Sequence, residues 1–514
     1  MSPTWYYSTE LQVFDCHIVY ALLFHLTSDW SLVRLWGALL MQWMMLGAFG
    51  FLARQARIPF NRFCVAGAAM LLPFSVPYGR IILFHNYYSF YMIMANLTVG
   101  LYLGAVRRMQ AEGFWKRWAF WVFGGMMCLV SFAAGLGGVR ELMVCTAPLL
   151  ASALLCALVG ERKLAEQGKN GLKAALPALG MAVLTFACSG LGYLVNLNVF
   201  SKIYHYTDYS SQYVALSGLG DLSNVLRDFL LSLGFHDQNE LMELYGLLGI
   251  GTVLVWLAAV LLAFHTLRNT EDFHARFLSI FMLVTHLVMV FVFMLLVLDG
   301  FRGDLYFLPA TFWIIPAMAK ADLRPDSGMD PEEKRTGFPG RLLAGDAPVS
   351  VHGLTALLVL SIMIANGFYY TGFFRNPEEY KQVEYSGLNF GDTGNVKGMQ
   401  PIADFLVENG YSMIYGSYWD AAVITELTDG KVKSVPVEPG RRKHPIQYSN
   451  WLSDGVLRDP AVVAEKKVAV VANFELGSSL GEDNPYGATE VFYDNGYTVY
   501  EFPDPAVLAK DLQD

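Results

Sequence analysis

The sequence predicts an α-helical polytopic membrane domain of about ten spans, followed by a soluble C-terminal α/β domain. Only 16% of the residues are charged and the mean hydropathy is +0.37, whereas soluble globular proteins carry roughly 25% charged residues. Apolar stretches of about 17–25 residues, the length that crosses a bilayer, recur as far as residue 371 and then stop. Residues 375–514 carry 12 Lys and Arg against 22 Asp and Glu, so the net charge of −9 lies almost wholly in this tail.

Residues 1–30 are predicted to form an outer loop with a membrane-parallel helix. The stretch WYYSTELQVFDCH (5–17) is too polar to span a membrane, and it lacks the basic and apolar regions of a signal peptide. The following HIVYALLFHLTSDW has the length and amphipathic pattern of one short interfacial helix. An outer polar segment without a preceding span is unusual, so we expect that one helix is missing ahead of Met1.

The transmembrane domain is predicted to cover residues 31–371. Its ten spans are expected at about 31–53, 62–79, 86–106, 116–137, 140–160, 172–195, 246–266, 277–299, 304–320 and 352–371. The loops that alternate with them are basic at 54–62, 107–117, 161–173, 266–276 and 320–341. The positive-inside rule places these loops in the cytoplasm of a multi-pass plasma-membrane protein. The N-terminus, the loop 196–245 and the tail 372–514 are then extracytoplasmic.

Two loops and the tail have recognisable patterns. Within 196–245, VLRDFLLSLGF has helical spacing and is expected to lie on the membrane as a lid, while the Pro-, Gly- and charge-rich 321–350 is expected to be a linker. In the tail, PIADFLVENG and WDAAVITELTDG are predicted helices, and YSMIYGSY, KVKSVPV, KKVAVVANF and TVYEF are predicted strands. This alternation predicts a small sheet with helices on its faces.

Several classes of function lack support in the sequence. The acidic tail is unsuited to nucleic acid, which requires Lys and Arg to neutralise phosphates. The tail has no Walker A pattern and no GxGxxG after a strand. All six cysteines precede the tail without metal-ligand spacing, so we interpret them as packing residues. No motif specifies a metal, and the cofactor is unknown.

The candidate site is a set of polar residues that four predicted outer segments bring to one membrane surface. Ionisable groups at membrane depth are costly and are therefore seldom without a role. The set comprises Glu10, Asp15 and His17; Arg80 and His85; Arg140 and Glu141; and Arg302 and Asp304. A carboxylate there could act as a general base or hold a divalent metal, and the arginines could bind phosphate. A lipid-linked sugar phosphate presents its phosphate at this level, with its apolar tail in the bilayer.

Each residue also has a simpler interpretation. Glu10 or Asp15 could be a solvated loop acid or a helix cap, and Arg140 with Glu141 a structural ion pair at a turn. His85 could belong to an aromatic belt with Tyr87 and Tyr88.

The layout resembles the GT-C superfamily of polytopic glycosyltransferases, including its mannosyltransferases that use dolichyl- or polyprenyl-phosphate sugars. In that superfamily an acidic residue in the first outer loop precedes a membrane-parallel helix, and WYYSTELQVFDCHIVYALLFHLTSDW resembles this arrangement, with Glu10 or Asp15 in the place of the acid. GLGGVRELM and FRGDLYFLPATFWIIPAM resemble segments with a rim Arg or with the turn that opens the last core helix. The sequence departs from the superfamily in lacking the first helix and in having His85 and Asn86 where many members carry another acid.

This resemblance implies inverting transfer from a polyprenyl-phosphate sugar to an extracytoplasmic glycan, lipid or protein of the cell envelope. Asp15 or Glu10 would be the catalytic base. Arg140, Arg302, His85 and Arg80 would bind the donor phosphate, with Glu141, Asp304 and His17 in support.

Two other functions remain open from the sequence. One is a non-catalytic membrane protein whose outer domain binds cell-wall glycan or a partner, with Trp419, Trp451, Tyr415 and Tyr418 as stacking residues. The other is a transporter or flippase for a lipid-linked solute, which would be expected to show internal repeats and broken mid-membrane helices.

Overall fold

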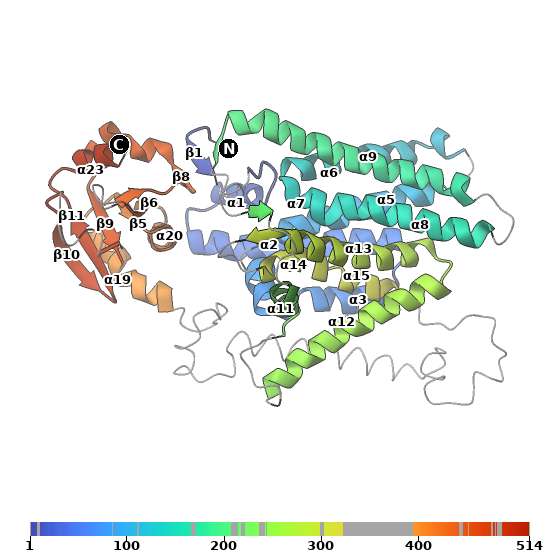
Figure 1. The fold of residues 1–514 in the computed structure, drawn as a ribbon. Helices are drawn as coiled ribbons and strands as arrows, with labels where there is room; N and C mark the ends of the chain where they lie inside the picture. The colour runs from blue at the N-terminus through green and yellow to red at the C-terminus, as the bar shows by residue number, and fades with distance from the viewer. Residues whose placement is uncertain are drawn as a thin grey trace.

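The structure, a computed structural model, describes residues 2–7, 11–84, 86–109, 113–165, 171–206, 214–216, 222–235, 242, 244–298, 303–321, 394–440, 446–450, 452–473, 476–477, 480 and 486–512. In this part of the chain, a helical bundle is followed by a C-terminal α/β domain, which confirms the predicted fold class (Figure 1). The α/β domain lies at the end of the bundle where helix α2 (Trp30–Ala56) begins, which we name the domain end. We name the opposite end, where α2 stops at Ala56, the basic end.

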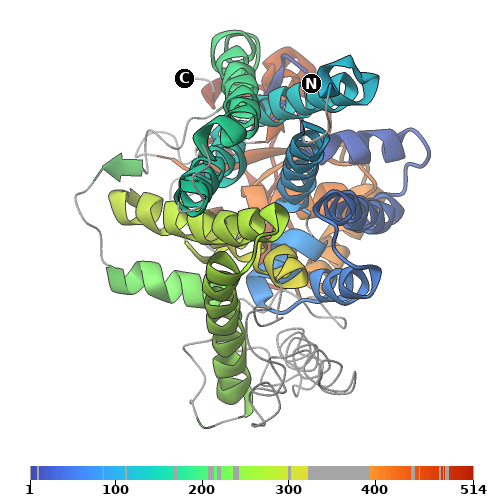
Figure 2. The same ribbon diagram turned by 90° about the vertical axis from the view of Figure 1, so that its right-hand side faces the viewer.

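Seven helices in the described part of the chain are long and apolar enough to cross a membrane. They are α2, α5 (Ser89–Met109), α6 (Trp118–Leu136), α8 (Ala147–Ala165) with the preceding turns α7 (Val139–Glu141) and η3 (Leu142–Thr146), α9 (Gly171–Asn198), α12 (Leu244–Asn269) and α13 (Phe273–Leu295). Figure 2 shows those of the first two hundred residues nearly end-on. The seven correspond to seven predicted spans, and the predicted span 352–371 lies outside the described residues.

The predicted spans 62–79 and 304–320 are not continuous helices. The first consists of α3 (Phe60–Met70), the short α4 (Val76–Tyr78) and the π-helical η1 (Gly79–Phe84). The second is divided into α14 (Asp304–Thr311) and α15 (Ile314–Lys320). Pro73 lies in the first break, and Pro316 has no N–H to donate to the carbonyl four residues earlier, which favours the second break. Hydropathy alone therefore predicted these two spans wrongly as single helices.

Helix α5 lies at the centre of the bundle, with 94% of its spanning window buried. Its side chains, Tyr102 among them, pack in the main core with Phe49 of α2 and with Phe277 and Phe281 of α13. The two ends of α5 therefore lie in the two polar regions of the bundle, one at the domain end and one at the basic end. Its first turn reaches the candidate site and its last turn carries Arg107 and Arg108 at the basic end.

Two short helices lie against the bundle, in the two segments where helices were predicted. Helix α1 (His17–Phe24) packs on α2 where Tyr20 covers Gly37, and it leaves Leu22 63% exposed. Helix α11 (Leu222–Ser232) buries Val225, Phe229 and Ser232, which share one face. Smaller elements of the membrane part are η2 (Phe114–Lys116), η4 (Phe200–Lys202), and the antiparallel pair β3 (Val214–Leu216) and β4 (Leu296–Leu298).

The C-terminal domain is a six-stranded sheet with helices on both faces. The strand order is β10 (Thr489–Asp494), β11 (Tyr497–Glu501), β9 (Val468–Ala472), β5 (Met413–Gly416), β6 (Lys433–Pro439) and β7 (Ile446–Tyr448). Strand β5 is parallel to both of its neighbours, and the outer pairs are antiparallel. Alternate residues form two cores, one with α21 (Pro460–Ala464) and α23 (Pro505–Asp511), the other with α19 (Gly394–Glu408) and α20 (Tyr418–Leu427). The predicted helices and strands of the tail are present.

A second, three-stranded sheet joins the two parts of the protein. Its central strand is β1 (Trp5–Tyr7), which pairs in parallel with β2 (His205–Tyr206) of the loop 196–245 and antiparallel with β8 (Ser453–Asp454) of the tail. The buried Arg458, in the turn η6 (Gly455–Arg458), stacks over the ring of Tyr6 at 4.1 Å. The polar, aromatic start of WYYSTELQVFDCH is therefore explained by strand pairing between the domain and the bundle.

Candidate functional site

The segment Leu11–Asp15 is held against the domain end of the bundle by backbone contacts. The Nδ2 atom of Asn196, near the end of α9, donates to the carbonyls of Leu11 and Leu136, each at 2.6 Å. The N–H of Val13 also donates to Leu136, at 3.3 Å. Because Asn196 is only 4% exposed, these bonds lie in the interior and fix the path of the segment.

Asp15 follows this segment and lies just before α1. It is 6% exposed, and its Oδ1 accepts the backbone N–H of Cys16 at 2.6 Å. Burial, with the adjacent Asp15 carboxylate, raises the pKa of the Cys16 thiol well above its usual range, so that this thiol stays protonated. The neighbouring His17 is exposed, and Glu10, the other candidate base, lies outside the described residues.

Arg140, in the turn α7, lies among three tyrosines. Its Nη1 donates to the hydroxyl of Tyr88 at 2.9 Å. Its guanidinium lies 5.4 Å from the ring centres of Tyr88 and Tyr306, and 5.9 Å from that of Tyr87. We call these four residues the Arg140 cluster. Tyr87 and Tyr88 come from the turn just before α5 and Tyr306 from α14, so the cluster joins three of the four predicted outer segments.

The remaining predicted outer segment, which carries Asp15, contacts the first turn of α5 beside the Arg140 cluster. Gln12 donates from Nε2 to the hydroxyl of Tyr91 at 2.6 Å, and the rings of Phe14 and Phe90 lie 5.6 Å apart. The rings of Tyr91 and Tyr88 are in edge contact at 5.7 Å. The segment that ends in Asp15 and the Arg140 cluster thus pack on one helical turn.

The side chain of Glu141 is directed away from solvent. The residue is 2% exposed, and neither carboxylate oxygen has a hydrogen-bond partner among the described residues. The π-helical turn η3 follows directly, and the π-helical turn η1 precedes the loop that carries Tyr87 and Tyr88. Irregular turns of this kind often occur at functional sites because they redirect side chains.

Asn86 has a structural role in the loop before α5. It is fully buried and adopts a left-handed backbone conformation (φ 57°). Its Nδ2 donates to the hydroxyl of Tyr20 at 3.0 Å, while its Oδ1 accepts from the hydroxyl of Ser89 at 3.2 Å. These bonds order the turn that presents Tyr87 and Tyr88 to Arg140.

The α/β domain covers the same end of the bundle through α20. The N–H of Trp30 donates to Asp429 Oδ1 at 3.1 Å, and Arg34 forms an ion pair with Glu426. At the other end of α20, burial, with the nearby Tyr87, raises the pKa of Tyr418. Tyr418 is therefore within electrostatic range of Tyr87 in the Arg140 cluster. Tyr415, one of the proposed stacking residues, is fully buried in the domain core instead.

Several sequence candidates cannot be placed as side chains. His85 and Arg302 lie outside the described residues, as does Trp451. For Arg80 in η1 and Asp304 at the start of α14, the structure describes only the backbone. The N–H of Gly303, just before Asp304, donates to Asp228 of α11 at 3.1 Å, which anchors that amphipathic helix beside α14.

The sequence reasoning missed four residues that organise the site: Gln12, Tyr88, Asn196 and Tyr306. Tyr87 and Tyr88 were interpreted as part of an aromatic belt. Asn196 could have been found, because a single polar residue in an apolar helix indicates a buried hydrogen bond. In the described part of the chain, no three His, Cys, Asp or Glu side chains are grouped so that they could hold a metal ion.

Comparisons of sequence and of fold with known proteins differ in their outcome. No family model and no curated protein sequence matches this chain. The chain is similar to the crystal structure of ArnT from Cupriavidus metallidurans bound to undecaprenyl phosphate, with 13% sequence identity and a TM-score of 0.43. The alignment covers 90% of this chain and 84% of that one.

Proposed function

We propose that this protein is a membrane glycosyltransferase that moves a sugar from a polyprenyl-phosphate donor to an extracytoplasmic glycan, lipid or protein. The observation that carries the proposal is the Arg140 cluster, which lies beside the segment ending in Asp15. The cluster brings a guanidinium and tyrosine hydroxyls together at one end of a helical bundle, and the segment that ends in Asp15 packs on the same turn of α5. An apolar chain that ends in a phosphate suits this end of the bundle, because the chain can remain in the bilayer while the phosphate reaches the arginine.

Arg140 is assigned to the donor phosphate. The guanidinium presents its donors in a planar fork that matches phosphate oxygens. The bond to Tyr88 and the surrounding rings hold the side chain in place, so little reorganisation is needed when charge develops. Arg302, His85 and Arg80 are the further donor-binding candidates, and Glu141, Asp304 and His17 are supporting ones.

Asp15 is assigned as the general base, with Glu10 as the alternative. The carboxylate takes the proton of the acceptor hydroxyl, whose oxygen forms a new bond to the anomeric carbon. The bond between that carbon and the phosphate oxygen breaks, and the polyprenyl phosphate leaves with the electron pair. Arg140 stabilises the phosphate charge that becomes complete only as this bond breaks. The configuration at the anomeric carbon is inverted.

The proposal is tested with purified protein in proteoliposomes and radiolabelled polyprenyl-phosphate sugars, after native mass spectrometry for bound polyprenyl phosphate. We expect Asp15→Asn to abolish transfer without loss of lipid binding, and Arg140→Ala to weaken lipid binding. Lys202→Gln, an exposed residue at the domain end, is the matched control and should leave both unchanged. A protein that neither binds polyprenyl phosphate nor transfers any sugar would refute the proposal and favour the non-catalytic glycan-binding function.

A further inference from the structure

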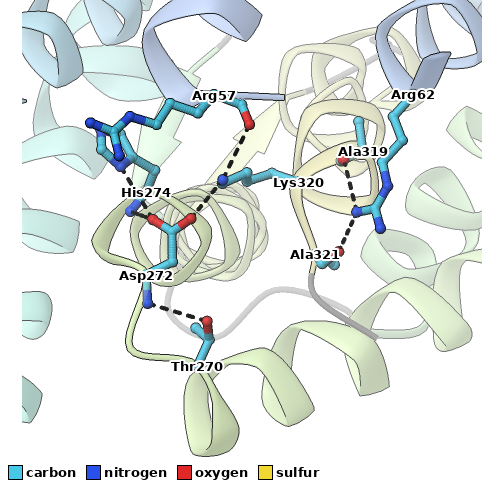
Figure 3. A network of polar contacts seen from close by, with 8 residues as sticks. All are labelled: Arg57, Arg62, Thr270, Asp272, His274, Ala319, Lys320 and Ala321. Carbon is cyan, nitrogen blue, oxygen red and sulfur yellow. Dashed lines mark hydrogen bonds and ion pairs between the residues drawn. The ribbon is translucent and has the colours of Figure 1, made fainter. Parts of the chain in front are cut away.

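The cationic side chains at the basic end of the bundle fall into two groups. Those of the first group have acceptors within the protein. Asp272, between α12 and α13, receives the ammonium of Lys320 at 2.6 Å and the Nδ1 of His274 at 3.2 Å (Figure 3). Arg62 donates to the carbonyls of Ala321 at 2.7 Å and Ala319 at 3.5 Å. These contacts tie the loops after α2, α12 and α15 into one polar network that uses its own acceptors.

The second group consists of three arginines at the ends of α2 and α5: Arg54, Arg57 and Arg107. Arg107 is hydrogen-bonded to Gln55, which lies between Arg54 and Arg57 at the end of α2, so the three like charges are gathered at one place. Over the described residues, no carboxylate forms an ion pair with any of them. Such a group is repulsive unless an anion lies between its members.

Arg107 is held in a fixed orientation. Its Nη2 donates at 2.9 Å to the Oε1 of Gln55, an amide that is 4% exposed in the last turn of α2. The adjacent Arg108 is directed elsewhere, since its guanidinium stacks on Phe123 at 3.4 Å and donates to Gly104. Arg107 therefore faces the end of α2, where Arg54 and Arg57 lie.

The backbone at Arg57 provides an independent indication. This residue ends α2 in the left-handed conformation (φ 57°, ψ 44°), a position that glycine or asparagine usually occupies. Its carbonyl accepts from Lys320 at 3.4 Å, and its guanidinium is exposed (Figure 3). A strained backbone that displays an arginine suggests that its side chain has a use at this place.

Exposed aromatic residues around the arginines mark the depth of the membrane interface. Trp115, Trp118 and Trp121, at the start of the neighbouring α6, are 58%, 78% and 64% exposed, and Phe60 after α2 is 78% exposed. Tryptophan in this setting prefers the headgroup layer of a bilayer. The three arginines therefore lie at the level of lipid phosphates.

We propose that Arg54, Arg57 and Arg107 form a binding site for the phosphate headgroup of an anionic phospholipid at the basic end. This site is separate from the Arg140 cluster, because α2, with 27 residues, extends about 40 Å between the two ends. It is also independent of the proposed glycosyl transfer. The phosphate neutralises the repulsion among the arginines, and the acyl chains lie along the exposed faces of α2 and α6.

The test uses the full chain in nanodiscs that contain phosphatidylglycerol and phosphatidylcholine, with bound lipid counted by native mass spectrometry after mild delipidation. The variant is Arg54→Gln with Arg57→Gln, which leaves Arg107 and its buried partner intact. Each juxtamembrane cation contributes about a five-fold preference, so the double variant should lose roughly 30-fold in preference for phosphatidylglycerol. The matched control, Lys202→Gln with Lys431→Gln, removes two exposed cations from elsewhere and should change nothing.

Two further measurements separate a lipid site from a general anion site. Raising the salt from about 0.1 M to about 1 M should reduce the preference of the wild-type protein, because screening shortens the range of the arginine charges. Inorganic phosphate at the same concentration as the lipid should not displace phosphatidylglycerol. An unchanged preference in the double variant, or full displacement by inorganic phosphate, would overturn the proposal.

Discussion

Replacing Gly135 with alanine tests how the crossing of α6 and α9 supports the candidate site. A Cβ at Gly135 would fall on the carbonyl oxygen of Ser189 and lie 2.9 Å from the backbone nitrogen of Tyr193. Ordinary van der Waals contact begins at 3.4 Å, and backbone atoms cannot rotate away. Gly192 on α9 faces the carbonyl of Phe132 in the same manner, so the two helices meet through a reciprocal pair of glycines.

The expected loss follows from these distances. Relieving Tyr193 alone requires a shift from 2.9 to 3.4 Å, and the carbonyl of Ser189 requires more. Overpacking of this kind destabilises a protein by about 1–3 kcal/mol. Separation of the helices also strains the bond from Asn196 to the carbonyl of Leu136, the residue after Gly135. We therefore expect a lower free energy of unfolding and a looser attachment of the segment Leu11–Asp15 to the bundle.

The assay is the free energy of unfolding in bicelles, measured by steric trapping, with Gly125→Ala as control. Gly125 lies on the same helix with no atom within 4 Å of its Cβ position, so its substitution reports helix propensity alone. Gly135→Ala should be less stable than this control by about 1–3 kcal/mol. Adding Gly192→Ala should cost less than its single effect, because the helices have already separated. Equal stability of Gly135→Ala and Gly125→Ala would refute the close crossing.

Three further predictions concern other parts of the structure. Burial alone would raise the pKa of Asp272, but hydrogen bonds from His274 and then Lys320 hold it well below its ordinary value of 3.8. Its carboxylate therefore stabilises the fold above about pH 4 and loses this effect as the pH falls. Asp272→Asn should lower the melting temperature at pH 7 and flatten its acid dependence, and an unchanged dependence would contradict this. Asn196→Ala should lower the free energy of unfolding by about 1–3 kcal/mol, because the buried carbonyl of Leu11 loses this donor and that of Leu136 keeps only the longer bond from Val13; chemical denaturation would measure the loss. Gly496→Val should make the tail more sensitive to protease, because the hairpin turn requires a φ of 83° there, and wild-type resistance would argue against that turn.

The membrane helices could be predicted because lipid imposes a simple rule on length and polarity. The same rule wrongly predicted continuous helices across Pro73 and Pro316, because it takes no account of the backbone hydrogen bond that a proline cannot make. In the tail, strands β5, β6, β9 and β11 were predicted, with β9 visible as a nearly continuous apolar run. Strand β10 was missed although Asn495 and Gly496 carry the signature of a tight hairpin, which the structure shows with positive φ at both.

The candidate site was partly visible in the sequence. Asp15, Arg140 and Glu141 could be singled out because charge near a span is costly. Their partners could not, because Tyr88 and Tyr306 look like ordinary interfacial aromatic residues until four distant segments pack together. Pairing of this kind is set by the tertiary fold and leaves no local pattern.

The position of β1 has a consequence for biosynthesis. Its pairing partner β8 is made about 450 residues later, which at 5–20 residues per second is a delay of roughly 20–90 s. During this time Trp5–Tyr7 have only β2 to pair with, and an unpaired strand edge is open to wrong partners. The outer edge of β1 therefore stays open until residues 453–454 have been made and brought back to it, so this edge is one of the last parts of the described fold to gain its partner.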